Sequence, residues 1–293
     1  MRQVPPADVA TINQRVAAAR DRLRAADLLP AEADLSARLL AQHLLEWDTA
    51  RLLTSGNEHE PDGFADRFEA LVARREAREP LHYIVGHREF WGLKLEVTPA
   101  VLIPRPETEL IVEAVLALAP ASQLFTMIDA CTGCGNVAVA VAKERANARI
   151  VATDISSAAL EVAKRNAARH GVEARVTFVQ ADVFGDVSGP VDLITANPPY
   201  VPERHARGLQ PEVGGHEPHV ALFGGGYDGL TLFERVVRES SPLLRPGGHL
   251  ICEFGFGQEI EVEDILKSSA ELTLVELKRD LQGLARTAVA VRT

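Results

Sequence analysis

The sequence predicts an α/β protein in which a doubly wound, mainly parallel sheet of seven strands follows a small helical domain and a β-hairpin linker. Three observations support this fold class. From Leu110 onward, short apolar runs typical of strands alternate with helical stretches, as in parallel sheets that are covered by helices. Residues 1 to about 80 show helical spacing with little β-signal. Residues 89–97 then switch to the alternation of a hairpin.

The first domain, residues 1–82, is predicted to be helical because its apolar side chains recur at helical spacing. Pro30 and the stretch 55–63 separate the helical segments. These amphipathic helices could present a surface to a membrane or a partner, but a small bundle with its own core is the favoured interpretation. The positions that carry the pattern are Ile12, Val16, Leu23, Leu35, Leu39, Leu44, Phe64, Phe68 and Leu71.

Residues 83–105 form the predicted hairpin linker, and residues 106–293 form the α/β domain. A helix is expected to begin at Pro106, with Glu107 and Glu109 in its first turn, where acidic side chains are favoured. The last two predicted strands leave no room for a crossover helix between them, so one of them should run antiparallel. The predicted strands span residues 124–130, 149–154, 175–180, 191–196, 248–254, 272–278 and 286–292.

Composition excludes several classes of protein. The 293 residues carry a net charge of −10, so there is no basic footprint for direct binding to nucleic acid. No apolar stretch approaches the roughly 20 residues of a membrane span, and the N-terminus lacks the apolar segment of a signal peptide. The three cysteines are too few for a disulfide framework. We therefore expect a soluble, cytoplasmic protein.

One turn carries the strongest chemical signal. Residues 191–196 have the composition of a buried parallel strand, and ligands of α/β sheets bind at the carboxyl ends of such strands. Asn197-Pro198-Pro199-Tyr200 follows directly, and its two prolines fix φ and remove backbone donors. The Asn197 amide oxygen and the Pro198 carbonyl can accept both hydrogens of a planar –NH2 group, and the Tyr200 ring can stack on it. The turn predicts a site that holds an amide or amino nitrogen.

The preceding strands end in residues suited to a nucleoside. Gly133 and Gly135, after the first strand, permit a tight turn and close approach of a ligand to the backbone. Asp154, at the end of the second strand, can accept hydrogen bonds from ribose hydroxyls. Asp182 and Val183 follow the third strand and can flank an adenine, although Asp182 could instead cap a helix. The glycine spacing also matches the dinucleotide fingerprint, so it leaves both an NAD enzyme and a methyltransferase open.

Together, these residues resemble the S-adenosylmethionine-binding and catalytic motifs of class I methyltransferases. A turn that grips an amide suits an N-methyltransferase and is not needed by a dehydrogenase. From about residue 8 to the C-terminus, the wider pattern resembles the peptide-chain release factor glutamine methyltransferase family. The motifs that carry this resemblance are Tyr83–Gly86, Phe90–Gly92, Val101–Glu109 with its Pro-Arg-Pro-Glu-Thr-Glu block, Glu217-Pro218, Ala221-Leu222, Asp228–Leu230 and Asp280-x-x-Gly283.

The resemblance implies transfer of a methyl group from S-adenosylmethionine, with S-adenosylhomocysteine as the product, to N5 of the glutamine in the Gly-Gly-Gln tip of class I peptide-chain release factors. It further implies that the helical domain helps to hold the release factor. We expect a monomer that requires no metal. The implied catalytic residues are Asn197, Pro198 and Tyr200, and the implied substrate-binding residues are Asn197, Pro198, Pro199, Tyr200 and Arg105. The implied cofactor-binding residues are Asp129, Cys131, Thr132, Gly133, Cys134, Gly135, Asp154, Ile155, Asp182, Val183 and Asn197.

Other functions remain open. A glutamine methyltransferase acting on a ribosomal protein is the nearest. A DNA or RNA amino-methyltransferase must extrude a base and bind a phosphate backbone, and the acidic balance argues against it. A binding module without turnover would have no need of an intact Asn197–Tyr200 turn. Cys131, Cys134 and Asn136 depart from the residues usual in the family, and the two cysteines have the spacing of a zinc or redox pair. No second pair of ligands accompanies them.

The stretch from residue 201 to residue 227 is long for a connection. We expect it to close over the substrate glutamine and exclude water, with the glycines 224–226 as a flexible point. The segment Glu253-Phe254-Gly255, at the end of the fifth strand, either turns the chain or borders the pocket. A metal cluster in the long loop is the alternative to solvated side chains, and solvated side chains are favoured; the residues concerned are His205, Glu212, His216, Glu217 and His219.

Overall fold

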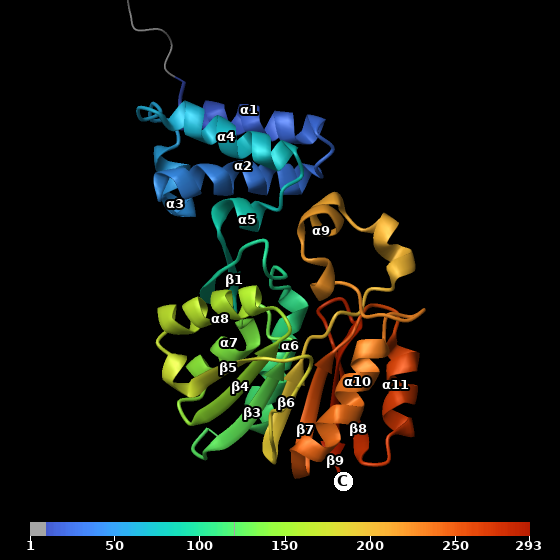
Figure 1. Cartoon of the computed structure of the whole chain (residues 1–293). Helices are drawn as coiled ribbons and strands as arrows, with labels where there is room; N and C mark the ends of the chain where they lie inside the picture. Colours follow the sequence, from blue (N-terminus) through green and yellow to red (C-terminus); the bar gives the residue numbers. More distant parts are fainter. Residues whose placement is uncertain (1–9, 120) are drawn as a thin grey trace, which may run out of the picture. The chain divides into compact units, whose positions relative to one another are not determined.

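The computed structural model describes residues 10–119 and 121–293. The chain divides into two compact units, Met1–Gly86 and His87–Thr293, and each is described by itself. Figure 1 shows the order of the helices and strands along the chain. None of the helices within the described residues is long and apolar enough to cross a membrane.

The first unit is built from helices. Its elements are α1 (Ile12–Ala25), α2 (Pro30–Leu45), α3 (Thr49–Ser55), α4 (Phe64–Glu76) and α5 (Leu81–Val85). A capping box begins α1: the Thr11 side chain accepts from the Gln14 backbone, and the Gln14 side chain accepts from the Thr11 backbone at 2.7 Å. Pro30 stands in the first turn of α2, where a missing N–H costs nothing. These elements confirm the helical prediction for this part of the chain.

The helices of the first unit enclose a core of their own. Leu23 from α1 and Leu40 from α2 are completely buried. Phe64 and Phe68 of α4 stack with their ring centroids 5.1 Å apart and belong to the same cluster. The apolar stripes seen in the sequence are therefore used for packing, as the bundle interpretation predicts.

The second unit opens with a hairpin of β1 (His87–Phe90) and β2 (Leu93–Glu96), which confirms the predicted switch to strand alternation. Trp91 and Gly92 form its two-residue turn, with φ angles of 51° and 68°. Tight hairpin turns require such positive φ values, which are unusual for a tryptophan. The Trp91 backbone N–H donates to Glu109 Oε1 at 2.8 Å, and this bond holds the turn against the start of the following helix.

A sheet of seven strands follows, in the order β5-β4-β3-β6-β7-β9-β8. All its pairs are parallel except that β9 runs antiparallel to both β7 and β8, which confirms the antiparallel strand predicted at the end of the chain. The strands are β3 (Phe125–Ala130), β4 (Ala148–Asp154), β5 (Val176–Gln180), β6 (Val191–Ala196), β7 (Leu244–Glu253), β8 (Leu272–Arg279) and β9 (Ala285–Arg292).

Helices cover both faces of the sheet. On one face, α10 (Thr231–Ser240) and α11 (Glu259–Ser268) pack against strand residues such as Ile128 and Ile194. The other layer contains α6 (Glu109–Leu118), α7 (Asn136–Glu144) and α8 (Ser157–Arg169), which contact one another and the sheet. A 3₁₀ turn, Pro106–Thr108, leads into α6, so the helix start predicted at Pro106 is confirmed.

The carboxyl ends of β3, β4, β5, β6 and β7 meet at one edge of the sheet because these strands are parallel to one another. The loop that contains Gly133 and Gly135 (the glycine loop) follows β3, Asp154 is the last residue of β4, and the Asn197–Tyr200 turn follows β6. Strand topology alone therefore brings together residues that are far apart in the sequence.

Candidate active site

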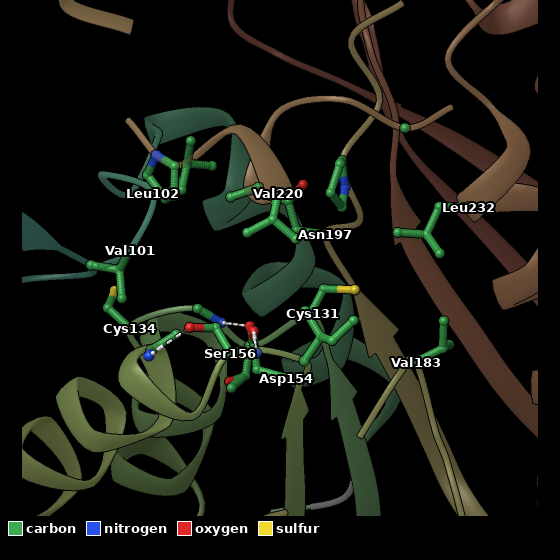
Figure 2. A pocket seen from close by; sticks show the side chains of 18 of the residues that line it. Val101, Leu102, Cys131, Cys134, Asp154, Ser156, Val183, Asn197, Val220 and Leu232 are labelled. Atoms are coloured by element: carbon green, nitrogen blue, oxygen red, sulfur yellow. Dashed lines mark hydrogen bonds between the residues drawn. The ribbon is translucent and has the colours of Figure 1, made fainter. Parts of the chain in front are cut away.

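A cavity of about 340 Å³ lies at this edge of the sheet, a size usual for sites that bind small molecules. Figure 2 shows Cys131, Asp154 and Asn197 around the same space. The predicted site residues that line it are Arg105, Cys131, Thr132, Gly133, Cys134, Asp154, Ile155, Asp182, Val183, Asn197 and Pro199. Those that lie outside its lining are Asp129, Gly135, Pro198 and Tyr200.

The two glycines of the first loop do different work. Gly133 has a φ of 56°, and a Cβ added to it would meet no atom within 4 Å, so its backbone faces open space in the cavity wall. Gly135 has a φ of 80° and caps α7, and its Cβ would lie 3.0 Å from the Cβ of Ala163 in α8. Gly133 thus leaves room for a ligand, whereas Gly135 lets two helices pack closely.

Asp129 stabilises the glycine loop through hydrogen bonds from behind the cavity wall. Its side chain accepts hydrogen bonds from the hydroxyls of Thr132 (2.6 Å) and Thr195 (2.7 Å), the latter opposite it in the β3–β6 pair. The residue is only 2 % exposed, and this burial raises the pKa of the carboxyl to about 6. Its place is therefore behind the cavity wall and not in it, and it shapes the loop that lines the cavity.

Asp154 occupies the position predicted for ribose binding. One carboxylate oxygen accepts the Gly133 N–H at 2.8 Å, and the other accepts the Ser156 N–H at 2.9 Å (Figure 2). Ser156 also caps α8 by accepting from the Ala159 backbone at 3.1 Å. Burial raises the pKa of the Asp154 carboxyl. The carboxylate is held at two points, and its remaining lone pairs are available to a ligand in the cavity.

The next side of the cavity combines apolar surface with an ion pair. Ile155 is 50 % exposed and Val183 is buried, and both line the cavity. Both Asp182 carboxylate oxygens accept from the Arg235 guanidinium of α10 at 3.0 Å. A turn follows Asp182 and no helix begins there, so the alternative that made it a helix cap is wrong. Arg235, which also lines the cavity, had not been singled out from the sequence.

The Asn197–Tyr200 turn follows β6 and contributes Asn197 and Pro199 to the lining of the cavity. Asn197 Nδ2 donates to the Thr108 hydroxyl at 3.1 Å, which turns the amide oxygen the other way. The Tyr200 hydroxyl donates to Glu253 Oε1 at 3.4 Å, and a Cβ on Gly255 would lie 2.9 Å from the Tyr200 ring. Tyr200 is thus packed behind the turn. Its predicted stacking on a substrate amide stays a prediction.

A glutamine that the sequence did not mark fixes this turn. Gln258 Oε1 accepts the Gly255 N–H at 2.7 Å, and its Nε2 donates to the carbonyls of Tyr200 (2.9 Å) and Asp228 (2.7 Å). One side-chain amide therefore ties together the end of β7, the Asn197–Tyr200 turn and the end of the long loop. Asn166 acts similarly on the other side, where it accepts from the Glu96 N–H at 2.7 Å and donates to the Cys134 carbonyl at 2.9 Å.

The long loop contains short helical segments: Glu203–Gly208, Pro211–His216 (α9) and His219–Ala221. The expectation of solvated side chains is wrong for Glu212 and Glu217, which are buried. Arg105 donates to both oxygens of Glu217, at 2.8 and 2.9 Å, and so ties the loop to the Pro-Arg-Pro block. Burial raises the pKa of the Glu217 carboxyl, and the Arg105 charge opposes that rise. His205 and His219 are exposed, as expected.

Gly224, the first of the three glycines that end the loop, is closely packed against other backbone segments. A Cβ on Gly224 would lie 1.9 Å from the Gly229 carbonyl oxygen and 2.4 Å from that of Pro199. This position therefore needs a glycine because two backbone segments approach it. Within the described ranges 10–119 and 121–293, no group of three or more histidine, cysteine or acidic side chains could hold a metal ion.

Two families of known domains match this chain in sequence. Residues 14–86 match the family described as PrmC N-terminal domain. Residues 107–210 match the family described as methyltransferase small domain.

Three relatives are each named release factor glutamine methyltransferase. The one from Cereibacter sphaeroides is 43 % identical over 269 residues, which cover 92 % of this chain and 94 % of that protein. The one from Moorella thermoacetica is 40 % identical and covers 87 % of this chain and 91 % of its own length. The one from Mycobacterium tuberculosis is 39 % identical and covers 96 % and 92 %.

Among solved structures, a methyltransferase from Pyrococcus furiosus is similar with a TM-score of 0.52. The similarity covers 76 % of this chain and 96 % of that one, at 18 % identity. At so low an identity it speaks for the fold alone, and it agrees with the predicted class I methyltransferase sheet.

Proposed function

This chain belongs to the release factor glutamine methyltransferase family, and we propose that it transfers a methyl group from S-adenosylmethionine to N5 of a glutamine in a class I peptide-chain release factor. The acceptor we assign is the glutamine of the factor's Gly-Gly-Gln tip. The helical unit, residues 10–86 of which are described, is proposed to help in holding the factor.

The residues around the cavity fit this methyl donor. Asp154 keeps lone pairs for the ribose hydroxyls, and the open space beside Gly133 lets a ligand approach the backbone. Ile155 and Val183 offer apolar surface to an adenine ring. When bound, S-adenosylmethionine supplies a methyl group on a positively charged sulfur, and the protein supplies its orientation. The acidic side chain of Asp154 in the lining complements that charge, whereas the charge of Asp182 is already paired with Arg235.

The orientation of Asn197 is the observation that carries the proposal. Because its Nδ2 is bonded to Thr108, its Oδ1 is the group left to accept an N–H from a substrate at the cavity. The carbonyl oxygen of Pro198 accepts no hydrogen bond from the described residues 10–119 and 121–293, and we propose it as the second acceptor. Asn197 and Pro198 are adjacent in the turn, although only Asn197 lines the cavity, and two acceptors there would suit the two N–H bonds of a primary amide and aim its nitrogen.

The proposed reaction is a direct displacement. The electron pair of the glutamine nitrogen forms the new bond to the methyl carbon, and the electrons of the broken carbon–sulfur bond go to sulfur. The alkylated nitrogen then loses one proton to solvent and becomes the neutral methylamide. A primary amide is a poor nucleophile, so positioning within roughly 3–3.5 Å of the methyl carbon is the protein's main contribution. Pro199 and Phe223, both in the cavity lining, supply apolar walls that exclude water.

We further propose that the enzyme acts as a monomer, in the cytoplasm, on a protein and without direct contact to nucleic acid. The net charge of −10 supports a protein substrate, because binding to a phosphate backbone relies on basic side chains.

The test is transfer of a labelled methyl group from S-adenosylmethionine to separate preparations of release factor, ribosomal proteins and nucleic acid. Label in the release factor alone is expected, and the Asn197→Ala variant should give none while its cofactor affinity stays within several-fold. Label in ribosomal proteins or nucleic acid instead would contradict the proposed substrate. Cofactor binding without transfer to any of the three would indicate a binding module.

A further inference from the structure

Glu253 is a buried carboxyl behind the Asn197–Tyr200 turn. It ends β7, is 1 % exposed and lies outside the lining of the cavity. Its Oε1 accepts from the Tyr200 hydroxyl at 3.4 Å, whereas its Oε2 is buried and has no hydrogen-bond partner within the described parts of the chain. A buried carboxyl with an unpaired oxygen destabilises a fold, so a role in stability does not explain it.

The same carboxyl reaches Asn197 through Thr108. The Thr108 hydroxyl accepts from Asn197 Nδ2 at 3.1 Å, and its own hydrogen remains for another acceptor. Thr108 is 1 % exposed, and its interaction with Glu253 lowers the pKa of that carboxyl. The Thr108 hydroxyl therefore interacts with both the Asn197 amide and the Glu253 carboxyl, and its hydrogen can be directed to Glu253. This direction of the hydrogen keeps the Asn197 oxygen turned away from Thr108.

We propose, on the basis of the function proposed above, that Glu253 is a positioning residue that orients the Asn197–Tyr200 turn for amide binding. It holds Tyr200 directly and orients the Asn197 side chain through Thr108. Glu253 touches neither substrate nor cofactor in this role.

Ionisation of Glu253 sets the direction of the Thr108 hydrogen. The ionised carboxyl carries no donor and can only accept, from Tyr200 and from Thr108, whereas the protonated carboxyl carries a donor of its own that can point at Thr108 and compete with Asn197. Burial and the nearby Glu107 charge raise the pKa of Glu253. Interactions with Thr108, Tyr200 and Arg286 lower it, and the resulting pKa is about 7. The aligned state should therefore be populated as the pH rises through about 7.

The kinetic test compares Glu253→Gln with Thr287→Val. Thr287 faces Glu253 across the β7–β9 pair, and its buried hydroxyl has no hydrogen-bond partner among the described residues, so its variant is the matched control. For Glu253→Gln we expect kcat to fall at least tenfold and its rise with pH to flatten, while the affinity for S-adenosylmethionine stays within twofold. Thr287→Val should keep the wild-type kcat and pH profile. Wild-type turnover and pH dependence in Glu253→Gln would overturn the inference.

A second readout needs no turnover and separates this inference from the proposed function. In protein with labelled asparagine, the side-chain amide resonance of Asn197, identified by its loss in Asn197→Ala, should shift with pH around 7. That shift should vanish in Glu253→Gln and in Thr108→Val, which lacks the connecting hydroxyl. A resonance that titrates unchanged in both variants, or that does not titrate in the wild type, would overturn the inference. Failure of the wild type to methylate release factor would overturn the proposed function alone.

Discussion

Replacing Asp154 with asparagine isolates the proposed contact with ribose. Both carboxylate oxygens of Asp154 accept backbone N–H groups, from Gly133 at 2.8 Å and Ser156 at 2.9 Å. The asparagine amide can replace only one of these acceptors, and its –NH2 group then faces a backbone donor. It also lacks the negative charge that strengthens hydrogen bonds from ribose hydroxyls.

The expected size of the effect follows from these contacts. Loss of a charge-assisted hydrogen bond costs about 1.5–3 kcal/mol, which weakens binding of S-adenosylmethionine roughly 10- to 150-fold. The fold should suffer less. Burial raises the pKa of Asp154, so the ionised carboxylate is itself a cost that the neutral asparagine removes. The free energy of binding should therefore fall by more than the free energy of unfolding.

Isothermal titration calorimetry with S-adenosylmethionine and S-adenosylhomocysteine measures this effect. The matched control is Asp192→Asn at the opposite end of the sheet, where Asp192 accepts from the Thr126 backbone at 2.6 Å. The control should lose stability and keep its cofactor affinity within twofold. A folded Asp154→Asn variant whose affinity also stays within twofold would refute the placement of ribose at Asp154.

Three further variants test other parts of the structure. Gly224→Ala should lower the free energy of unfolding, measured with denaturant, by about 1–3 kcal/mol or more, because its Cβ would lie 1.9 Å from the Gly229 carbonyl oxygen. Gly215 has open space around it, so Gly215→Ala should leave the free energy of unfolding nearly unchanged. Leu40→Ala should destabilise the helical unit by about 2–5 kcal/mol, because Leu40 is completely buried. The variant should keep its affinity for the cofactor, and a parallel loss of that affinity would contradict a cofactor site confined to the second unit. Burial raises the pKa of Glu253 from its ordinary 4.5 to about 7. The stability contributed by the protonated carboxyl is therefore fully present below about pH 4.5 and is lost as the pH rises through about 7, by at most about 3 kcal/mol. Glu253→Gln should flatten that part of the stability–pH curve, and an unchanged curve would contradict the pKa shift.

The architecture could be predicted from the sequence because its signals are local. Apolar runs separated by helical stretches mark the strands of a parallel sheet, and the short connection before β9 leaves only an antiparallel strand. The location of the candidate site follows from the same reasoning, because Asp154 and Asn197 both stand at the carboxyl ends of parallel strands. Once the topology is known, these residues must lie at the same edge.

The hydrogen-bond network behind the cavity could not be predicted in this way. Asn166 bonds to the Cys134 carbonyl 32 positions away, and Gln258 bonds to the Tyr200 carbonyl 58 positions away. Nothing in the neighbouring sequence of either residue marks such a partner, because side-chain contacts of this range depend on the packed structure. The burial of Glu217 could not be predicted for the same reason. Its surroundings are rich in proline, glycine and histidine, as in a solvated loop, but Arg105, 112 positions earlier, pairs with it in the interior.

Peptide mass spectrometry of a release factor shows directly whether this protein methylates one of the factor's glutamines. The class I release factor is incubated with S-adenosylmethionine and either the wild-type protein or the Asn197→Ala variant, and its peptides are then fragmented. One added methyl on the Gly-Gly-Gln glutamine is expected with the wild type and none with the variant. A methyl on any other residue, equal methylation by the variant, or an unmodified factor in the presence of bound cofactor would contradict the proposed methylation of that glutamine.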